Sequence, residues 1–214
     1  MRPQPRETGK RTSTAAVDAL LLAAGRSSRM GGPNKLLADF GGQPLVRRIA
    51  ERLLASKERS LTVVTGHQRQ AIEQALDGLD VRFVHNPEFA SGLASSLKAG
   101  VAALQGDCSA ALIALADMPA VTKADFDTMI AAASRFSAPA IIRATHNGKR
   151  GNPIILPSAV FADMVQLQGD TGARHVIETS GLPIIDVEIG AAASVDVDTP
   201  EALARAGGLL VEET

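Results

Sequence analysis

The segment LLLAAGRSSRMGGPNKLL, residues 20–37, joins a short apolar run to a loop rich in glycine and cations. Residues 17–23 predict a buried strand, which ends where this loop begins. The loop carries three glycines and three cations: Gly25, Gly31, Gly32, Arg26, Arg29 and Lys35. Glycines let backbone N–H groups approach phosphate oxygens, and arginine and lysine supply positive charge. The segment therefore predicts a phosphate-binding loop after the first strand.

This loop matches neither of two common nucleotide-binding fingerprints. It has no G-K-[ST] at the spacing of a Walker A loop and no G-x-G-x-x-G. An alternative interpretation is a glycine-rich surface turn with solvated basic side chains. The long pattern A-A-G-x-S-x-R-M-G-x-x-N-K-L-L favours phosphate binding over that alternative.

Further apolar runs alternate with amphipathic segments along the chain. The runs lie at 61–65, 81–84, 111–115, 140–143, 154–156 and 184–189. Helices are expected between them, including one over 92–104 with Leu93, Leu97, Val101 and Leu104 on one buried stripe. This alternation predicts an α/β fold: a doubly wound, mainly parallel sheet with helices on both faces, Rossmann-like in class. Ligands of such sheets bind at the carboxyl ends of the strands.

Composition bounds the remaining possibilities. The chain has 214 residues, a formal net charge of −1, one cysteine and neither Trp nor Tyr. We expect one domain over residues 16–210, preceded by a flexible tail over residues 1–15. The charge gives no reason to expect nucleic acid as a partner, and no apolar run predicts a membrane span. The single cysteine fits a cytoplasmic location.

Three aspartates are candidate metal ligands. Asp117 follows an apolar run in the sequence LADMP, and Asp196 and Asp198 precede the start of a predicted helix at Thr199. Mg²⁺ commonly takes one or two carboxylates together with substrate phosphates. Because Asp196 and Asp198 alternate along an extended segment, only one is expected to face the site, and position favours Asp198. The alternative role for all three is turn formation or helix capping.

Motifs along most of the chain resemble those of the MobA-like nucleotidyltransferases, and among these the molybdenum cofactor cytidylyltransferases. Besides the loop, they are TGHQ at 65–68, GLASSLKAG at 92–100, LADMP at 115–119, GNPIILP at 151–157, GDTGAR at 169–174 and DVDTPEAL at 196–203. The resemblance implies Mg²⁺ as cofactor, CTP or another NTP as one partner and molybdopterin as the other. A molybdoenzyme client is a further expected partner.

The resemblance also assigns roles to residues. Arg29, Lys35 and Asp117 would be catalytic, with Asp117 and either Asp198 or Asp196 holding the metal. Nucleotide-binding residues would be Ala23, Ala24, Gly25, Arg26, Gly31, Lys35, Thr65, Gly66 and Ser96. Related enzymes that use GTP carry Gly-Gly where this chain has Ala24-Gly25, so Ala24 favours cytosine. The acceptor would be bound by Asn152, Gly169, Asp170, Gly172 and Arg174.

The expected reaction is transfer of CMP from CTP to the phosphate of molybdopterin, with release of pyrophosphate. Three alternatives stay open at this point. One is a nucleotidyltransferase that uses another NTP or another phosphorylated acceptor, such as a sugar phosphate. The second is an oxidoreductase similar to nicotine blue oxidoreductase, and the third is a non-catalytic partner that carries the cofactor to a molybdoenzyme.

Overall fold

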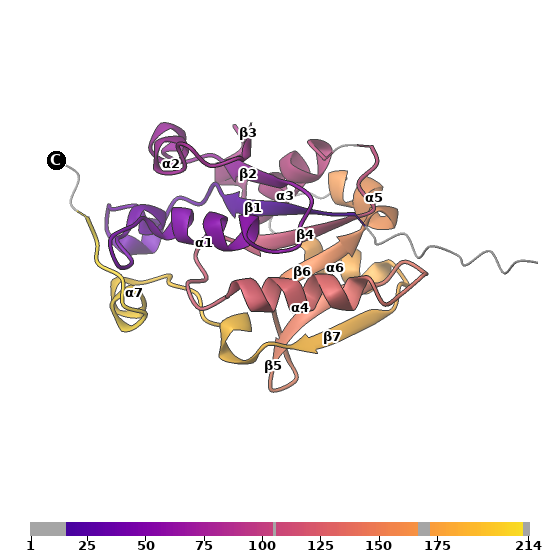
Figure 1. The fold of residues 1–214 in the computed structure, drawn as a ribbon. Helices are drawn as coiled ribbons and strands as arrows, with labels where there is room; N and C mark the ends of the chain where they lie inside the picture. Colours follow the sequence, from indigo (N-terminus) through magenta and orange to yellow (C-terminus); the bar gives the residue numbers. More distant parts are fainter. Residues whose placement is uncertain (1–15, 105, 167–171, 212–214) are drawn as a thin grey trace, which may run out of the picture.

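The computed structural model describes residues 16–104, 106–166 and 172–211 and has a seven-stranded sheet as its framework (Figure 1). The strand order is β3-β2-β1-β4-β6-β5-β7. The strands are β1 (Val17–Ala23), β2 (Leu61–Thr65), β3 (Arg82–His85), β4 (Ala110–Leu115), β5 (Ile141–His146), β6 (Lys149–Pro157) and β7 (Ile184–Glu188). The predicted N-terminal tail, residues 1–15, lies outside the described residues.

The sheet is mainly parallel, as the alternation of elements predicts, with one strand reversed. β3, β2, β1 and β4 are parallel neighbours, and β5 is parallel to β7. β6 runs antiparallel to both β4 and β5. The β5–β6 turn consists of Asn147 and Gly148, both with positive φ, which is the two-residue turn that suits the twist of a hairpin.

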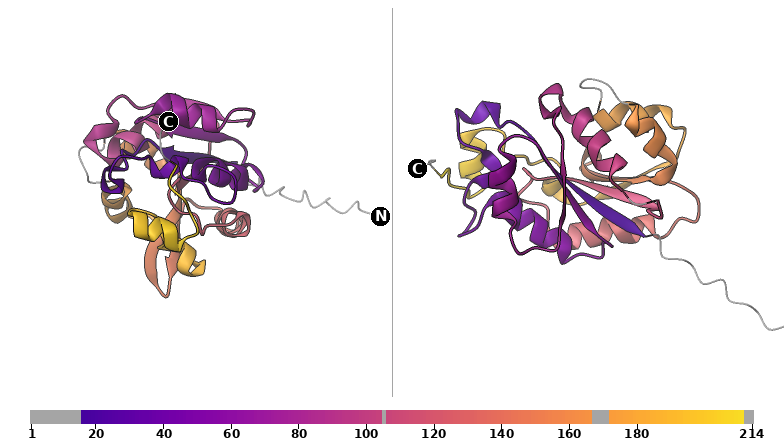
Figure 2. Two further views of the ribbon diagram at one scale, coloured as in Figure 1. Left: turned by 90° about the vertical axis from the view of Figure 1, so that its left-hand side faces the viewer. Right: turned by 90° about the horizontal axis from the view of Figure 1, so that it is seen from above.

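Helices cover both faces of the sheet (Figure 2). α1 (Leu45–Leu54) and α4 (Lys123–Ala133) contribute to one core cluster, and α3 (Leu93–Ala102), α5 (Phe161–Val165) and α6 (Gly172–Thr179) contribute to the other. α2 (Arg69–Ala75) and α7 (Pro200–Arg205) belong with the first face. None of the helices in the described ranges is long and apolar enough to cross a membrane.

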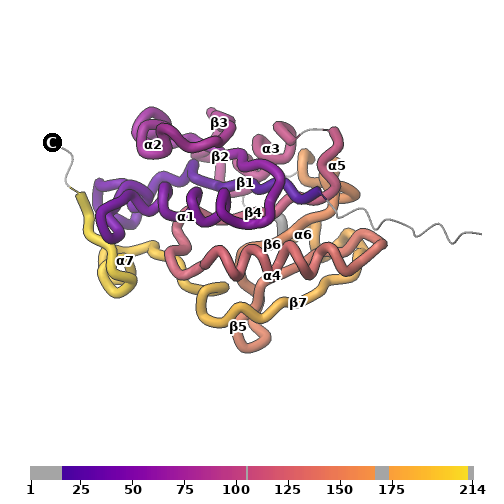
Figure 3. The backbone as a smooth tube through the Cα atoms, viewed as in Figure 1, coloured from indigo at the N-terminus to yellow at the C-terminus, as the bar shows by residue number. Residues whose placement is uncertain are grey.

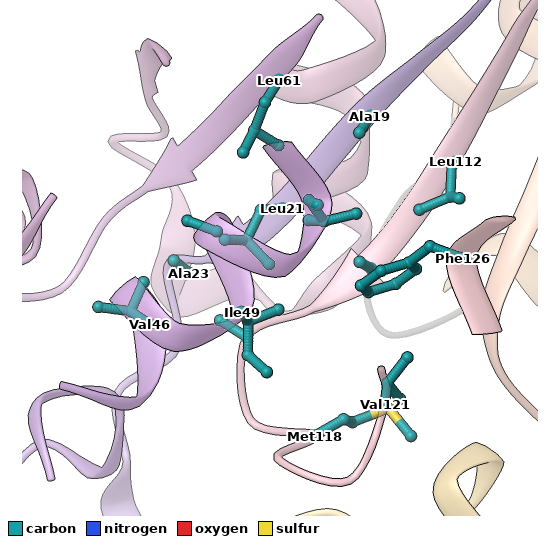
Figure 4. Packing of buried hydrophobic residues seen from close by; sticks show 14 of the residues in the cluster. Ala19, Leu21, Ala23, Val46, Ile49, Leu61, Leu112, Met118, Val121 and Phe126 are labelled. Carbon is teal, nitrogen blue, oxygen red and sulfur yellow. The ribbon is translucent and has the colours of Figure 1, made fainter. Parts of the chain in front are cut away.

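The side chains of β1 alternate between the two core clusters. Ala19, Leu21 and Ala23 pack with α1 and α4, as Figure 4 shows, whereas Leu20 and Leu22 pack with α3 on the opposite face. Every residue of β1 is buried, because the strand is central and covered on both sides. This double burial explains why its sequence is apolar except at Asp18, whose buried carboxylate is paired with Arg59.

The expected apolar stripe of α3 is correct only in part. Leu97 and Val101 are buried beneath the helix, but Leu93 is 47% exposed. Leu93 is the first residue of α3 and lies at the carboxyl edge of the sheet, where it lines a cavity instead of the core. The helical period identifies the face of a helix but not where the core ends along it.

The chain order places a ligand site between β1 and β4. From β1 the chain passes through α1 to β2 on one side, and from β3 it returns through α3 to β4 on the other. The carboxyl ends of these strands point toward the loop at residues 24–37, beside which α7 lies (Figure 3). In open α/β sheets the crevice at such a switch point receives the ligand.

Candidate active site

A cavity of about 430 Å³ opens at the carboxyl ends of β1 and β4. One part of its lining is apolar and the other is charged. The mainly apolar part comes from the end of β1 and from segment 89–96, and comprises Leu22, Ala24, Phe89, Ala90, Gly92, Leu93 and Ser96. The charged part comes from the loop, the end of β4 and the segment before α7, and comprises Gly25, Arg26, Ser27, Ser28, Arg29, Lys35, Leu36, Leu115, Asp117 and Asp198. A ligand with an apolar ring at one end and anionic groups at the other would match this division.

Lys35 lies at the centre of the charged part. Its Nζ is 2.5 Å from Asp117 Oδ2 and 2.5 Å from Asp198 Oδ1. Arg29 extends the same network, with its Nη2 2.7 Å from Asp198 Oδ2. Lys35 is 8% exposed, whereas the Arg29 side chain is 68% exposed. The structure thus brings together three segments that are far apart in the sequence.

The electrostatics of the network favour the charged forms of Lys35 and Asp198. Burial alone would lower the pKa of Lys35, but the carboxylates of Asp117 and Asp198 outweigh it and raise that pKa above its ordinary value. Burial would raise the pKa of Asp198, yet the hydrogen bond from Lys35 and the charge of Arg29 lower it. The site therefore holds fixed positive and negative charges at neutral pH.

The glycine-rich loop is closed by hydrogen bonds between its two ends. Ser27 has a left-handed backbone (φ 52°), and its hydroxyl donates to Asn34 Oδ1 at 3.2 Å. The backbone N–H of Lys35 donates to Ser27 Oγ at 3.2 Å. Asn34 Oδ1 also accepts from the N–H of Leu36, which caps the short helix at Lys35–Leu37. These bonds fix the backbone from which the Lys35 side chain reaches the aspartates.

Asp117 has one oxygen available for a further ligand. Its Oδ2 receives Lys35, but its Oδ1 is buried and has no hydrogen-bond partner among the described residues. A buried carboxylate oxygen without a partner is costly, and a hard cation would satisfy it. No group of three or more His, Cys, Asp or Glu gathers in the described part of the chain. Asp117 and Asp198 would thus hold a metal only together with ligand oxygens.

The two C-terminal aspartates differ as their alternation predicts. Asp198 lines the cavity, whereas Asp196 does not. Burial and the repulsion of Asp198 and Asp117 raise the pKa of Asp196. Asp198 precedes Thr199, whose hydroxyl caps α7 by accepting from the N–H of Ala202. This placement favours Asp198 over Asp196 as a metal ligand, and that role stays a prediction.

Several predicted nucleotide-binding residues lie beside the cavity rather than in its lining. Ala23 has its side chain in the core beneath α1 (Figure 4), and Thr65 is fully buried at the end of β2. Gly31 ends the short helix Ser28–Met30 with a φ of 76°. Gly66 packs so tightly that a Cβ there would lie 2.6 Å from the Cβ of Phe89. None of these four residues lines the cavity, so a nucleotide-binding role for them stays a prediction.

Among the described residues, the predicted acceptor residues Asn152 and Arg174 are absent from the cavity lining. Asn152 is in β6, whose antiparallel course brings its first residues to the carboxyl end of β4. Arg174 lies on the surface of α6, where its Nε is 2.8 Å from Glu178 Oε1, an oxygen that Arg150 also approaches at 3.5 Å. Gly172 is the first residue of α6. Gly169 and Asp170 lie outside the described residues, so an acceptor role for this segment stays a prediction.

Sequence reasoning missed three residues near the apolar part. Phe89 and Leu93 form part of its wall, and Asn86 lies behind Ser96, to which its Nδ2 donates at 3.1 Å. The available signal was the pair Asn86-Pro87 directly after β3, at the same sheet edge as the phosphate loop. Nothing in the pattern indicates that the asparagine turns inward.

The fold and the cavity define a nucleotidyltransferase of the Rossmann-like α/β class. Rv0371c from Mycobacterium tuberculosis H37Rv matches with a TM-score of 0.75 at 24% identity, over 88% of this chain and 96% of that one. A nucleotidyl transferase from Methanothermobacter thermautotroptrophicus matches with a TM-score of 0.74 at 26% identity, over 90% and 96%. A structure of Rv0371c in complex with manganese also matches, with a TM-score of 0.73 at 21% identity over 90% and 98%.

The chain belongs to the MobA-like NTP transferase domain family, whose model matches residues 19–184. It is 29% identical to the molybdenum cofactor cytidylyltransferase of Escherichia coli K12, over 87% of this chain and 93% of that protein. It is 28% identical to nicotine blue oxidoreductase of Paenarthrobacter nicotinovorans, over 91% and 98%. It is 30% identical to a molybdenum cofactor guanylyltransferase of Pseudomonas aeruginosa LESB58, over 87% and 92%. The predicted family is confirmed.

Proposed function

We propose that this protein transfers CMP from CTP to the terminal phosphate of molybdopterin and releases pyrophosphate. The observation that carries the proposal is the contact of Lys35 with both Asp117 and Asp198 beneath the glycine-rich loop, in one cavity with an apolar end. That arrangement suits a triphosphate at the charged end and a base at the other. A cytoplasmic location remains a prediction from the single cysteine.

CTP is preferred to GTP in this proposal because of Ala24. This residue lines the cavity next to Gly25, and related enzymes that use GTP carry glycine in its place. Its Cβ narrows the apolar end, which suits the smaller ring of cytosine. The similarity to both a cytidylyltransferase and a guanylyltransferase leaves this choice to experiment.

Mg²⁺ is the proposed cofactor, held by Asp117 and Asp198. The buried Oδ1 of Asp117 without a partner and the small number of carboxylates fit a cation that also binds substrate phosphates. When bound, Mg²⁺ would neutralise negative charge on the triphosphate. Asp117 Oδ1 is open to the cation, but binding to Asp198 Oδ1 would require Lys35 to leave that oxygen, which frees the ammonium group for the phosphates.

The residues of the chain would act by positioning and by charge stabilisation. The attacking phosphate of the acceptor is already anionic, so no general base is needed. Its oxygen forms a bond to the α-phosphorus of CTP while the bond to the β-phosphate oxygen breaks and pyrophosphate leaves. Lys35 would stabilise the α-phosphate and Arg29 the departing pyrophosphate, because fixed cations stabilise the charge that develops in such a transition state.

Acceptor binding is proposed for the region around β6 and the start of α6. Asn152 lies near the carboxyl end of β4, and Arg150 and Arg174 share Glu178 on the neighbouring surface. The two arginines offer guanidinium groups for a phosphate. Gly169, Asp170 and Gly172 belong to the same proposed region.

The deciding experiment is a panel of CTP, GTP, UTP and ATP with Mg²⁺ and molybdopterin, read as pyrophosphate release. We expect pyrophosphate to form from CTP and only when acceptor is present. Asp117→Asn should lower kcat by about 10²–10³, the range for loss of one electrostatic stabiliser. Lys98→Met, a change of an exposed lysine on α3, is the matched control and should leave kcat unchanged.

Full turnover by Asp117→Asn would contradict the assigned site, and equal turnover of all four nucleotides would contradict the CTP preference. The similarity to nicotine blue oxidoreductase makes a redox reaction the second candidate. Oxidation of NADH or NADPH by the protein, without pyrophosphate release in the panel, would favour that candidate.

A further inference from the structure

A buried asparagine, Asn86, makes a hydrogen bond to Ser96, which lines the cavity. Asn86 is 2% exposed and follows β3, whose carboxyl end lies at the same sheet edge as the phosphate loop. Its backbone N–H donates to the carbonyl of Thr65 at 2.8 Å, which anchors it to β2. Its side chain points to Ser95 and Ser96 at the start of α3.

The orientation of the Asn86 amide follows from its neighbours. The backbone N–H of Glu88 donates to Asn86 Oδ1 at 2.9 Å, and a backbone N–H can only donate. Nδ2 must therefore face the serines, where it lies 2.8 Å from Ser95 Oγ and 3.1 Å from Ser96 Oγ. Both hydroxyl oxygens thus accept hydrogen bonds from a group that cannot accept in return.

The two serines differ in whether the protein supplies an acceptor for their hydroxyl protons. The hydroxyl of Ser95 has the carbonyls of Gly92 at 2.8 Å and Glu88 at 2.9 Å as acceptors. Ser96 has no hydrogen-bond acceptor among the residues that the structure describes, and it lines the cavity. Its O–H is therefore available to a ligand, while its oxygen is held by Asn86.

We propose that Asn86 is a positioning residue that fixes the Ser96 hydroxyl as a hydrogen-bond donor into the apolar end of the cavity and so selects a base that presents an acceptor there. Cytosine offers O2 and N3 as adjacent acceptors, whereas guanine presents N1–H and N2–H donors on the comparable edge. A buried donor facing another donor leaves both unpaired, which is the strongest basis for rejecting a wrong base. This inference rests on the proposed function.

Asn86→Asp tests the proposal because it reverses the polarity with little change of size. A carboxylate only accepts, so Ser96 would donate its proton to residue 86 and present lone pairs to the cavity. We expect KM for CTP to rise about tenfold or more with kcat within about threefold, because the lost contact binds ground state and transition state alike. Ser95→Ala is the matched control, since Ser95 also binds Asn86 but lies outside the cavity lining, and it should leave KM unchanged.

A double-mutant cycle separates positioning from a general structural effect. In a Ser96→Ala background, Asn86→Asp should add little to KM. An equal rise in KM with and without Ser96 would overturn the proposal, as would an unchanged KM in the single variant. If Asn86→Asp melts below the assay temperature, Asn86→Ala replaces it, with an expected rise of about threefold that also disappears without Ser96. Failure of the wild-type protein to bind any NTP would instead refute the proposed function.

Discussion

Lys35 is buried between two carboxylates because none of the three charges could remain there alone. A buried charge without a partner is unstable, and Asp117 and Asp198 each lie 2.5 Å from the ammonium nitrogen. The same two carboxyl groups are the proposed metal ligands, and at Asp198 both oxygens are already taken, Oδ1 by Lys35 and Oδ2 by Arg29. Lys35 and a divalent cation therefore compete for one position when no triphosphate is bound, and a triphosphate would relieve the competition by attracting Lys35.

Lys35→Met is accordingly expected to bind Mn²⁺ more tightly than the wild-type protein in the absence of nucleotide. Methionine is unbranched and only one atom shorter than lysine, and the change leaves Asp117 without a cation and Asp198 with Arg29 alone, so affinity should rise by about tenfold or more. Titration of free Mn²⁺ by electron paramagnetic resonance measures it directly. Lys98→Met, on an exposed face of α3, should not change the affinity. Weaker or equal Mn²⁺ binding by Lys35→Met would refute the competition.

Sequence alone could predict the charged residues of the candidate site, but not the buried asparagine that contacts Ser96. Lys35 and Asp117 each follow a buried strand of a parallel sheet, and such strands end at one edge. Asn86 gives no comparable signal, because Asn-Pro after a strand reads as an ordinary turn. Its contact with Ser96 depends on how α3 packs on β2, and only the packed structure determines that.

At the scale of elements, the reversed strand β6 is the main feature that the apolar runs do not predict. Short apolar runs have no direction, so a parallel and an antiparallel partner look alike. The signal was present in Asn147-Gly148, since Asn-Gly between two strands indicates a two-residue hairpin. The longer extent of β6, Lys149–Pro157, follows from the same hairpin. The reversal brings Asn152 to the edge that carries the site.

The GNP sequence at the start of β6 has a structural reason besides its proposed acceptor role. A Cβ on Gly151 would lie 2.0 Å from the carbonyl oxygen of Ala193, a backbone atom in the short helix Gly190–Ala193. Gly151→Ala should therefore lower the free energy of unfolding by about 1–3 kcal/mol, as measured by urea denaturation. Gly106→Ala is the control, because a Cβ there meets nothing within 4 Å. Equal stability of the two variants would show that the short helix Gly190–Ala193 can shift away from residue 151 without loss of stability.

At the scale of the whole molecule, the site forms because the C-terminal segment packs against the segment that follows β1. α7 follows Asp198, and the segment after it pairs Leu209 with Asp39 through two backbone hydrogen bonds of 2.9 and 2.8 Å. Phe40 packs against Gly208 so closely that a Cβ there would lie 2.5 Å from its ring. Strand number and fold class could be predicted from local patterns. The strand order and this closure depend on contacts distant in sequence, which local patterns do not encode.

The edge of the sheet opposite the site carries a carboxylate that should make stability depend on pH. Glu58 lies just before Arg59, whose N–H donates to the carbonyl of Val17 at the start of β1. The Oε2 atom of Glu58 is buried and has no hydrogen-bond partner among the described residues. Burial, together with the nearby charges of Asp18 and Asp80, raises the pKa of Glu58 from 4.5 to about 7. The folded protein therefore keeps a proton on Glu58 that the unfolded chain has already lost.

Stability should consequently fall as pH rises from about 4.5 to about 7, because in this range the unfolded state binds fewer protons than the folded state. Glu58→Gln removes the titrating group and should raise the free energy of unfolding at pH 8 by about 1–2 kcal/mol after allowance for solvent screening, with little gain at pH 4.5. Urea denaturation at both pH values measures the difference. Glu73→Gln, which removes a partly exposed carboxylate paired with Arg69, should produce no such pH-dependent gain. A Glu58→Gln variant that gains equally at both pH values would mean that packing, and not the buried charge, is responsible.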